Sequence, residues 1–438
     1  MSNKYPDIKF SKYNVVFENK NNLYIYNSFT GGLLEVDETL KKHFKIGEGF
    51  EQISTSFKSL PKETLEDLIS GGILVDSSVD EAKTLRCSSQ IARYTTDNLT
   101  LTIAPTTRCN FRCPYCYENI ENQTSMSNNT IAQIPHFIEE NFPNIKSLQI
   151  VWYGGEPLLE LEKITTLTNE LTNKNYCLLP ASIVTNGYLL NRKVAYELTE
   201  LGINHAQVTI DGSRNDHDSR RIPKTGVPTF DRILNNIRSC ADLLDITIRI
   251  NADKTNIEHA NELLDELKEA DLRDNVSISL APVTNYNEKN SDLGMCFSSH
   301  QFAEEEYIFY KKAMQEGFNV IDNLLHRRQI CGAISYNSYV IDPYGDLYKC
   351  WDLIGNTNER IGTIFDSIQL NDSHCKWLLY NPYKENCINC KVLPMCNGGC
   401  PNQFNQTGQL GCCTSLYNLD KKLKLISYAL DSKGDLNE

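Results

Sequence analysis

The chain has 438 residues, 40% hydrophobic and 23% charged, and 43 basic against 56 acidic residues give a formal net charge of -13. This length favours two to three globular domains, and the acidic balance argues against a nucleic-acid partner, which needs a basic face. We also expect a cytoplasmic protein without a membrane partner, because no apolar run approaches a membrane span and residues 1–10 lack the apolar core of a signal peptide.

Residues 1–92 predict a small module of strands followed by helices. Short strands are expected over residues 13–17, 23–26 and 33–36, with turn-forming residues between them. Asp37 is suited to cap a helix through residue 44, and a second helix is expected over residues 62–68, before a short strand at 71–75. This order and size are typical of a winged-helix-like module.

Residues 93–321 alternate strands with helices, which is the pattern of a parallel sheet. Candidate strands lie at residues 99–104, 147–153, 182–185, 205–210, 245–250 and 276–280, and candidate helices at 128–140, 163–172, 192–201, 230–243 and 256–270. Six such units predict a partial (β/α)6 barrel of the TIM type within an α/β fold, with its chemistry at the carboxyl ends of the strands. An open doubly wound sheet ranks lower, since no G-x-G-x-x-G fingerprint is present.

Residues 322–438 form a cysteine-rich segment with one predicted hairpin, over residues 339–348. Besides Cys375, eight of the 16 cysteines lie here, and three lie between residues 109 and 116. In a reducing compartment such groups are better candidates for metal ligands than for disulfides. The other five are expected to be buried, small apolar residues: Cys87, Cys177, Cys240, Cys296 and Cys375.

Cys109, Cys113 and Cys116 form a C-x3-C-x2-C motif in the loop after the first barrel strand. Three thiolates on one short loop can ligate three irons of a [4Fe–4S] cluster and leave the fourth iron open. A structural zinc site or a ferredoxin-type cluster needs four ligands, and no fourth ligand lies nearby. The motif therefore favours a cluster with an open iron.

With Tyr115 directly before the last cysteine, this motif resembles the signature of the radical S-adenosylmethionine (SAM) superfamily. The resemblance implies that the open iron binds SAM and that one electron cleaves it to methionine and a 5′-deoxyadenosyl radical, which abstracts a substrate hydrogen. The cysteines of this loop would thus hold the catalytic cluster.

Further motifs follow in the order that this superfamily shows. Residues 154–157 resemble its GGEP loop, which receives the amino group of SAM, and residues 185–187 its TNG motif. Residues 209–212 resemble a serine-containing S-L-D-G segment, and residues 217–221 resemble H-D-x-x-R, which would place Arg221, or Arg220 beside it, on the SAM carboxylate. The resemblance implies that SAM is bound by Tyr115, Gly154, Gly155, Glu156, Thr185, Asn186, Thr209, Arg221 and Asn251.

The cysteines of residues 331–413 resemble the SPASM extension of peptide-modifying members of the superfamily, with C-x13-G-x4-C followed by C-x2-C-x5-C-x3-C. The resemblance implies two auxiliary [4Fe–4S] clusters, and hence three clusters in all. One would be held by Cys331, Cys350 and Cys400, and the other by Cys387, Cys390, Cys396 and either Cys412 or Cys413. A zinc ribbon is the alternative, but it leaves several of these cysteines unexplained.

Two departures from the SPASM pattern bear on function. The first auxiliary set has only three clear ligands, so either the spare of Cys412 and Cys413 completes it or one iron is open to a substrate thiolate, as proposed for thioether-forming relatives. Trp351 stands where sulfatase-maturing relatives carry an aspartate that acts as a base. Asp352 follows one residue later and is the candidate base here.

The N-terminal module resembles the peptide-recognition winged helix of peptide-modifying enzymes, which binds a leader peptide by adding it as a strand to an exposed edge. Together these resemblances imply a radical SAM enzyme, reduced by a protein such as flavodoxin or ferredoxin, that cross-links a ribosomally made precursor peptide. A thioether is the favoured product, with a carbon–carbon cross-link or epimerisation as other outcomes. The alternatives are a sulfatase-maturase-like enzyme that forms formylglycine and, in another class, a non-catalytic iron–sulfur or zinc protein that binds peptides.

Overall fold

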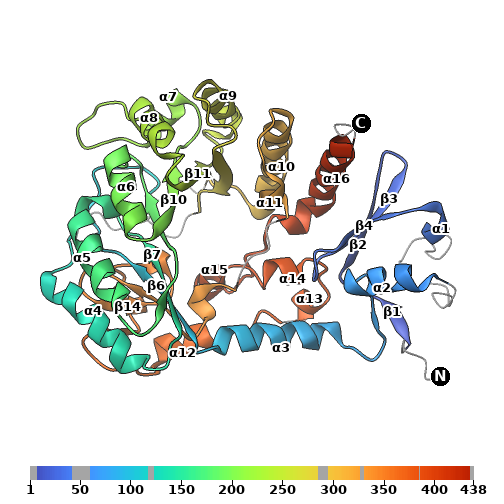
Figure 1. The fold of residues 1–438 in the computed structure, drawn as a ribbon, viewed down its shortest axis with the longest axis horizontal. Coiled ribbons are helices and arrows are strands. Elements are labelled where there is room, and N and C mark those ends of the chain that lie inside the picture. Colours follow the sequence, from blue (N-terminus) through green and yellow to red (C-terminus); the bar gives the residue numbers. More distant parts are fainter. Residues whose placement is uncertain are drawn as a thin grey trace.

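The computed structural model describes residues 7–41, 60–116, 123–284, 294–325, 330–383 and 385–434. Two small antiparallel sheets of the N-terminal segment lie at one end of the molecule, and a large sheet covered by helices lies at the other (Figure 1). The short helices of the cysteine-rich segment lie between them, beside the long helix α3 (Glu81–Tyr94). Within the described ranges, no helix has both the length and the apolar character that a membrane crossing requires.

The six predicted barrel strands are all present and form one parallel run. Their order across the sheet is β12-β11-β10-β9-β7-β6, and the short β8 (Cys177–Leu178) pairs with β7 outside this path. The prediction of a parallel, partial-barrel α/β unit is therefore confirmed. The strands are β6 (Asn98–Ile103), β7 (Ser147–Trp152), β9 (Ala181–Thr185), β10 (Ile203–Thr209), β11 (Asp245–Ala252) and β12 (Val276–Pro282).

The predicted barrel helices cover this sheet. Alternate residues of β6, namely Leu99, Leu101 and Ile103, are fully buried in the core beneath them, as the two-residue period of a strand requires. Side-chain oxygens of Ser127 and Asn191 cap two of these helices by accepting backbone N–H groups. The helices are α4 (Asn128–Asn141), α5 (Leu161–Thr172), α6 (Arg192–Glu200), α8 (Phe230–Cys240) and α9 (Glu262–Glu269), and α7 (Arg214–Arg220) and α10 (Ser299–Gln315) are additional.

The predicted hairpin is present and continues the barrel sheet beyond β6. Strand β13 (Ser338–Ile341) pairs parallel to β6, and β14 (Asp346–Tyr348) and β15 (Gly362–Thr363) follow antiparallel. The turn between β13 and β14 needs a left-handed residue, which Gly345 supplies at φ +85°. The cysteine-rich segment thus shares its first strands with the sheet that carries the cysteine loop.

The N-terminal segment forms the three predicted strands as one antiparallel sheet, β2 (Asn14–Asn19), β3 (Asn22–Asn27) and β4 (Leu33–Val36). Asp37 caps α1 (Glu38–Lys41) as predicted, because its Oδ1 accepts a hydrogen bond from Leu40 N at 2.7 Å. The predicted continuation of this helix to residue 44 lies outside the described residues. The predicted second helix is α2 (Lys62–Ser70), and β5 (Leu74–Asp76) pairs with β1 (Ile8–Phe10).

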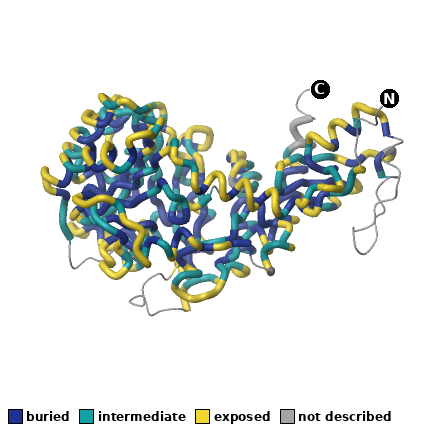
Figure 2. The backbone as a smooth tube through the Cα atoms, turned by 90° about the horizontal axis from the view of Figure 1, so that it is seen from below, coloured by how far each residue is buried: buried dark blue, intermediate teal, exposed yellow. Residues whose placement is uncertain are grey.

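Helix α3, which the sequence did not predict, joins the two ends of the molecule (Figure 1). At its start the buried Glu81 accepts a hydrogen bond from Lys12 N at 2.9 Å. At its end the buried Arg93 donates to the carbonyls of Ile334 (3.0 Å) and Leu378 (2.6 Å), in the segment that carries the C-terminal cysteines. Figure 2 shows buried residues on both sides of this connection, and along α3 every fourth residue from Glu81 to Arg93 is buried.

The C-terminal helix α16 (Ser415–Gly434) returns to pack against both β2 and α10. A buried ion pair between Lys422 and Glu306, 2.7 Å apart, fixes α16 to α10. The remaining short elements of the cysteine-rich segment are α11 (Ile321–Leu324), α12 (Asp372–Leu378), α13 (Glu385–Ile388), α14 (Leu393–Cys396) and α15 (Pro401–Thr407).

Candidate active site

The loop of residues 104–116 follows β6 and carries the first cysteine motif. Backbone hydrogen bonds hold it on two sides: Thr107 N donates to Thr124 O at 2.9 Å, and Arg112 N donates to Ile222 O at 2.7 Å. The second contact sets the cysteines beside the end of α7, about a hundred residues later in the chain. The sequence motifs are thereby brought together at one end of the barrel strands.

The three thiols of this loop are half-buried. Burial raises the pKa of Cys109 to about 12, and the charge of Glu156 adds to the increase. Burial also raises the pKa of Cys113, while the nearby Arg221 cation acts in the opposite direction. No three His, Cys, Asp or Glu side chains of the described residues stand as a ready-made metal site, so the fit to a cluster is judged from the donors. Three thiols on one loop are the donor set that a [4Fe–4S] cluster uses, and they would lose their protons on binding iron.

The predicted glycine loop packs directly on this cysteine loop. Gly154 has φ +112°, and a Cβ there would overlap the carbonyl oxygen of Thr106. A Cβ on Gly155 would overlap the carbonyl oxygen of Arg108. Gly155 N also donates to Thr106 O at 3.1 Å. Glycine is therefore required at both positions for the two loops to approach this closely.

Glu156 is fully buried and links the ends of β7 and β9. Its carboxylate accepts hydrogen bonds from Thr185 Oγ1 (2.7 Å), Asn186 N (2.7 Å) and Leu158 N (3.1 Å). Burial raises the pKa of Glu156, and these hydrogen bonds oppose the increase. A carboxylate has about four acceptor positions, so one remains for a ligand.

Asn186 turns from this carboxylate towards the cysteine loop. Its Nδ2 donates to Asn110 Oδ1 at 2.7 Å and lies 3.9 Å from the Cys109 sulfur. The structure therefore brings together the cysteine, glycine and TNG motifs that the sequence predicted, by hydrogen bonds among their own residues.

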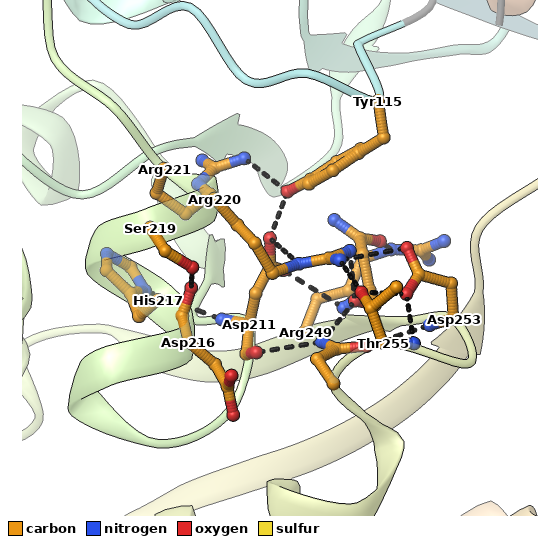
Figure 3. Close-up of polar contacts among 12 residues, drawn as sticks. Tyr115, Asp211, Asp216, His217, Ser219, Arg220, Arg221, Arg249, Asp253 and Thr255 are labelled. Atoms are coloured by element: carbon orange, nitrogen blue, oxygen red, sulfur yellow. Dashed lines mark hydrogen bonds and ion pairs between the residues drawn. The ribbon is translucent and has the colours of Figure 1, made fainter. Parts of the chain in front are cut away.

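Tyr115 is the centre of a second, charged network (Figure 3). Its hydroxyl donates to the carboxylate of Asp211, which is fully buried, and accepts from Arg221 Nη1 at 3.1 Å. The Arg220 guanidinium lies 4.8 Å from the centre of the Tyr115 ring, within cation–π range. Asn251 joins through its backbone N, which donates to Asp211 Oδ1 at 3.1 Å. Thr209 is buried nearby, at the end of β10.

The two neighbouring arginines differ in their partners. Arg220 forms an ion pair with Asp253 at 2.8 Å and lies 3.8 Å from Asp211, so its charge is matched by buried carboxylates. Arg221 makes no ion pair within the described residues, its only hydrogen bond from the guanidinium goes to Tyr115, and its Nε is buried without a hydrogen-bond partner. Arg221 is therefore the cation of this network that is suited to an anionic ligand.

The cysteines of the first auxiliary set lie close together. Burial raises the pKa of Cys350, and the neighbouring charges of Asp352, Cys331 and Cys400 act in the same direction. Cys400 caps α15, with its sulfur accepting from Gln403 N at 3.5 Å. The three cysteines come from a loop, a strand end and a helix start, which only the folded chain brings into range.

The second auxiliary set separates Cys412 from Cys413. Burial raises the pKa of Cys412, and the charges of Cys396 and Cys390 add to the increase, so these three thiols are neighbours. Cys413 is buried in an apolar cluster with Met395, Leu419 and other residues of α16 and the N-terminal sheet. Cys412 is less buried than Cys413 and is our candidate ligand for the second set.

Asp352 and Trp351 face the barrel from the end of β14. The Cys350 thiol donates to Asp352 Oδ2 at 3.5 Å, and burial raises the pKa of Asp352 to about 6 although Arg249 opposes the increase. The Trp351 ring stacks on Tyr153, the residue directly before the glycine loop, with ring centres 5.3 Å apart.

The expectation for the scattered cysteines was wrong in part. Cys240 is buried, but Cys87 and Cys177 are exposed and Cys296 and Cys375 are half-buried. Cys87 lies on the exposed face of α3, whose buried face is formed by Glu81, Leu85, Ser89 and Arg93, and Cys177 begins the two-residue strand β8.

Several residues of the site were not predicted, notably Asp211, Asp253 and Tyr153. The signal for Asp211 was present, since it lies within the strand-end motif at 209–212. Tyr153 directly precedes the glycine loop, but its contact with Trp351 depends on residues about two hundred positions apart.

Comparison with known proteins identifies the barrel. Residues 103–267 match the family model described as the Radical SAM superfamily. The chain is 23% identical to the radical SAM cyclopropyl synthase TigE of Paramaledivibacter caminithermalis, over 90% of this chain and 89% of that protein.

Two solved structures share the fold. One is native anSMEcpe with bound AdoMet and Kp18Cys peptide, with a TM-score of 0.61 and 19% identity over 76% of this chain and 99% of that one. The other is Streptococcus suis SuiB bound to its precursor peptide SuiA, with a TM-score of 0.52 and 15% identity over 91% of this chain and 97% of that one. At these identities the similarity establishes the architecture alone.

Proposed function

Residues 103–267 make this chain a radical SAM enzyme, and from that premise we propose that it modifies a ribosomally made precursor peptide. The observation that carries the proposal is the position of Tyr153, whose hydroxyl is under the influence of both Cys116 of the cysteine loop and Cys350 of the first auxiliary set. Two groups of thiols close to one tyrosine suit a substrate whose oxidation needs both. The peptides bound in the anSMEcpe and SuiB structures support the same substrate class.

A [4Fe–4S] cluster on Cys109, Cys113 and Cys116 and the SAM molecule supply one-electron chemistry that removes a substrate hydrogen. The chain's own residues orient that cofactor. Arg221 provides the buried positive charge for a carboxylate, and Glu156 retains one acceptor position towards an amino group. Gly154 and Gly155 allow backbone approach, and Thr185, Asn186, Thr209 and Asn251 line the neighbouring strand ends.

Two auxiliary clusters complete the proposed cofactor set, with a flavodoxin or ferredoxin as the external reductant. Cys331, Cys350 and Cys400 would hold one, and the other would be held by Cys387, Cys390, Cys396 and Cys412. With Cys412 assigned to the second set and Cys413 packed in the apolar cluster, three thiols remain for the first. A cluster held by three thiols would leave one iron open to a substrate thiolate.

The N-terminal sheet is the proposed binding site for the leader of the precursor. Among the strands of the described ranges, β4 pairs on one side only, with β3, whereas α16 packs on β2 at the other edge. An extended peptide can add to β4 through backbone hydrogen bonds. The prediction that residues 1–92 form a winged-helix-like peptide-recognition module is part of the same proposal.

The proposed domain division is residues 1–92, 93–321 and 322–438. Strands β13 to β15 belong to the third part but complete the sheet of the second. A chain cut at residue 321 would therefore expose the edge of β6, and we expect it to be poorly soluble.

The favoured product is a thioether, in which a substrate sulfur joins a carbon that has lost its hydrogen. The second candidate is a cyclopropane ring, because TigE is a cyclopropyl synthase. Both reactions remove two hydrogens, so each lowers the peptide mass by about two units. They differ in that a thioether consumes a cysteine thiol.

The test is anaerobic co-expression with the short reading frames beside the gene, followed by intact mass and thiol alkylation of the peptides. A loss of about two mass units with loss of one alkylation site supports a thioether. The same mass loss with all thiols alkylated supports a cyclopropane or another carbon–carbon bond. Deuterium uptake from heavy water without any mass loss supports epimerisation. A Cys109→Ala, Cys113→Ala, Cys116→Ala variant that still modifies the peptide would exclude radical SAM chemistry.

Formylglycine formation is the other enzymatic candidate. Asp352 lies within hydrogen-bonding range of Cys350 but one position later than the aspartate of sulfatase-maturing enzymes. Activity on a short C-x-P-x-R peptide would favour this candidate, and the absence of activity there, with a modified precursor, would remove it.

A further inference from the structure

Trp351 differs from the other tryptophans of the chain. Trp152 and Trp377 are fully buried, whereas Trp351 is 44% exposed. Its covered face lies against Tyr153, nearly parallel at an interplanar angle of 13°. The pair joins the residue after Cys350 to the residue before the glycine loop, so it connects the two halves of the active site.

The pair lies near both groups of cysteines. Burial raises the pKa of Tyr153, and the charges of Asp352, Cys116 and Cys350 add to the increase, while Arg249 acts in the opposite direction. Tyr153 and Cys350 also pack against the same apolar cluster. A substrate group on which both sets of cysteines act has to lie close to this pair.

The Tyr153 half of the pair is packed from behind. Tyr153 and Cys350 pack against a buried apolar cluster that includes Ala104, Tyr348 and Trp377. A fixed aromatic surface loses little entropy on binding, and aromatic faces favour flat or apolar partners. Asp352 and Arg249 both act electrostatically on Tyr153, and such polar groups suit peptide amides.

We infer that Trp351 and Tyr153 form an aromatic platform that binds an apolar side chain of the substrate between the two groups of cysteines, and that Trp351 determines specificity. The biological role of this platform rests on the proposed function. The inference adds that the substrate residue bound there has an apolar side chain. It assigns a role to the tryptophan that occupies the aspartate position of sulfatase-maturing enzymes.

The test uses the reconstituted, SAM-loaded enzyme and saturation-transfer NMR with N-acetyl-leucine amide as the probe and N-acetyl-glycine amide as the reference. We expect the leucine probe to give the stronger signal with the wild type and with Trp351→Phe. We expect the signal to fall at least threefold in Trp351→Ala, in line with the energy of an aromatic contact. Tyr344→Ala is the matched control, because Tyr344 is an exposed aromatic residue of the nearby hairpin turn.

Iron per chain is measured on every variant. A wild-type signal in Trp351→Ala with full iron would overturn the inference, as would an equal loss in Tyr344→Ala. If Trp351→Ala loses iron, Trp351→Gln, which fills more of the space, replaces it, and iron loss in both variants would make Trp351 structural and overturn the inference. The probe is not the natural substrate, so failure to find a modified peptide would count against the proposed function and leave this result intact.

Discussion

Arg221 donates to the hydroxyl of Tyr115 over 3.1 Å, and the same hydroxyl donates to Asp211. The contact ties the cysteine loop after the first barrel strand to the helix after the fourth (Figure 3). Because the tyrosine is neutral, it orients the guanidinium without cancelling its charge. Arg221 thus stays available to an anion in a buried site, where an electrostatic interaction is stronger than in water.

Replacing Arg221 and Arg220 separately should give opposite results. Arg221→Met is expected to weaken SAM binding at least tenfold with little change in stability, because it removes a cation that forms no ion pair with a carboxylate of the described residues. Arg220→Met leaves two buried carboxylates, Asp211 and Asp253, without their cation, and should lower the free energy of unfolding by about 3–5 kcal/mol.

Equilibrium dialysis of SAM and urea denaturation check this pair of variants. Arg238→Met, on the exposed surface of α8, is the control and should change neither quantity. Tighter SAM binding by Arg221→Met than by Arg220→Met would show that the wrong arginine has been chosen.

The adjacent cysteines Cys412 and Cys413 should respond differently to alanine. Cys412→Ala is expected to lose roughly four irons per chain, because its thiol lies with Cys390 and Cys396. Cys413→Ala should retain the iron and lose only about 1 kcal/mol of stability from the small cavity in its apolar cluster. Iron analysis of the purified proteins decides, and iron loss confined to Cys413→Ala would reverse the assignment.

Lys349 is expected to position the first auxiliary set. The buried ammonium donates to the carbonyls of Ser335 and Ser338, each at 2.5 Å, and so holds the segment after Cys331 against the strand end that carries Cys350. Lys349→Met should leave these carbonyls without a donor, at a cost of about 1–3 kcal/mol each.

We therefore expect Lys349→Met to lose roughly four irons while the electron paramagnetic resonance signal of the SAM-binding cluster persists and still responds to SAM. Lys376→Met, at an exposed ion pair with Glu359, is the control. Full iron occupancy in Lys349→Met would contradict a positioning role.

Asp342 should give the fold a pH dependence. Burial raises its pKa from 3.8 to about 6, although the backbone N–H groups of Tyr344 and Asp346 donate to it. The folded state thus holds the proton more tightly than the unfolded state, and this stabilisation is complete below about pH 4 and is lost as the pH rises through 6. The loss is about 2–3 kcal/mol.

Asp342→Asn, which keeps the acceptor for both N–H groups, removes that dependence. The difference in unfolding free energy between wild type and variant, measured by urea denaturation from pH 4 to pH 7, should change by this amount in favour of the variant. A constant difference across that range would show that burial does not hold the proton on Asp342.

Most of the barrel was predictable because its signals are local. The alternation of apolar residues in 99–103 and the helix caps at Ser127 and Asn191 each act within a few residues, and all six strands were found. Helix α3 was missed because it is stabilised at its ends by Glu81 and Arg93, whose partners lie in distant segments.

The sequence by itself determined the chemistry: the spacing of Cys109, Cys113 and Cys116 limits how many irons one loop can hold, whatever the rest of the chain does. The tertiary structure decided the partners. Arg220 and Arg221 are indistinguishable as neighbours in sequence, and only the packing of the strand ends gives one of them two buried carboxylates and the other a tyrosine. Charge pairing depends on distances through space, which sequence spacing does not fix once the chain has folded back on itself.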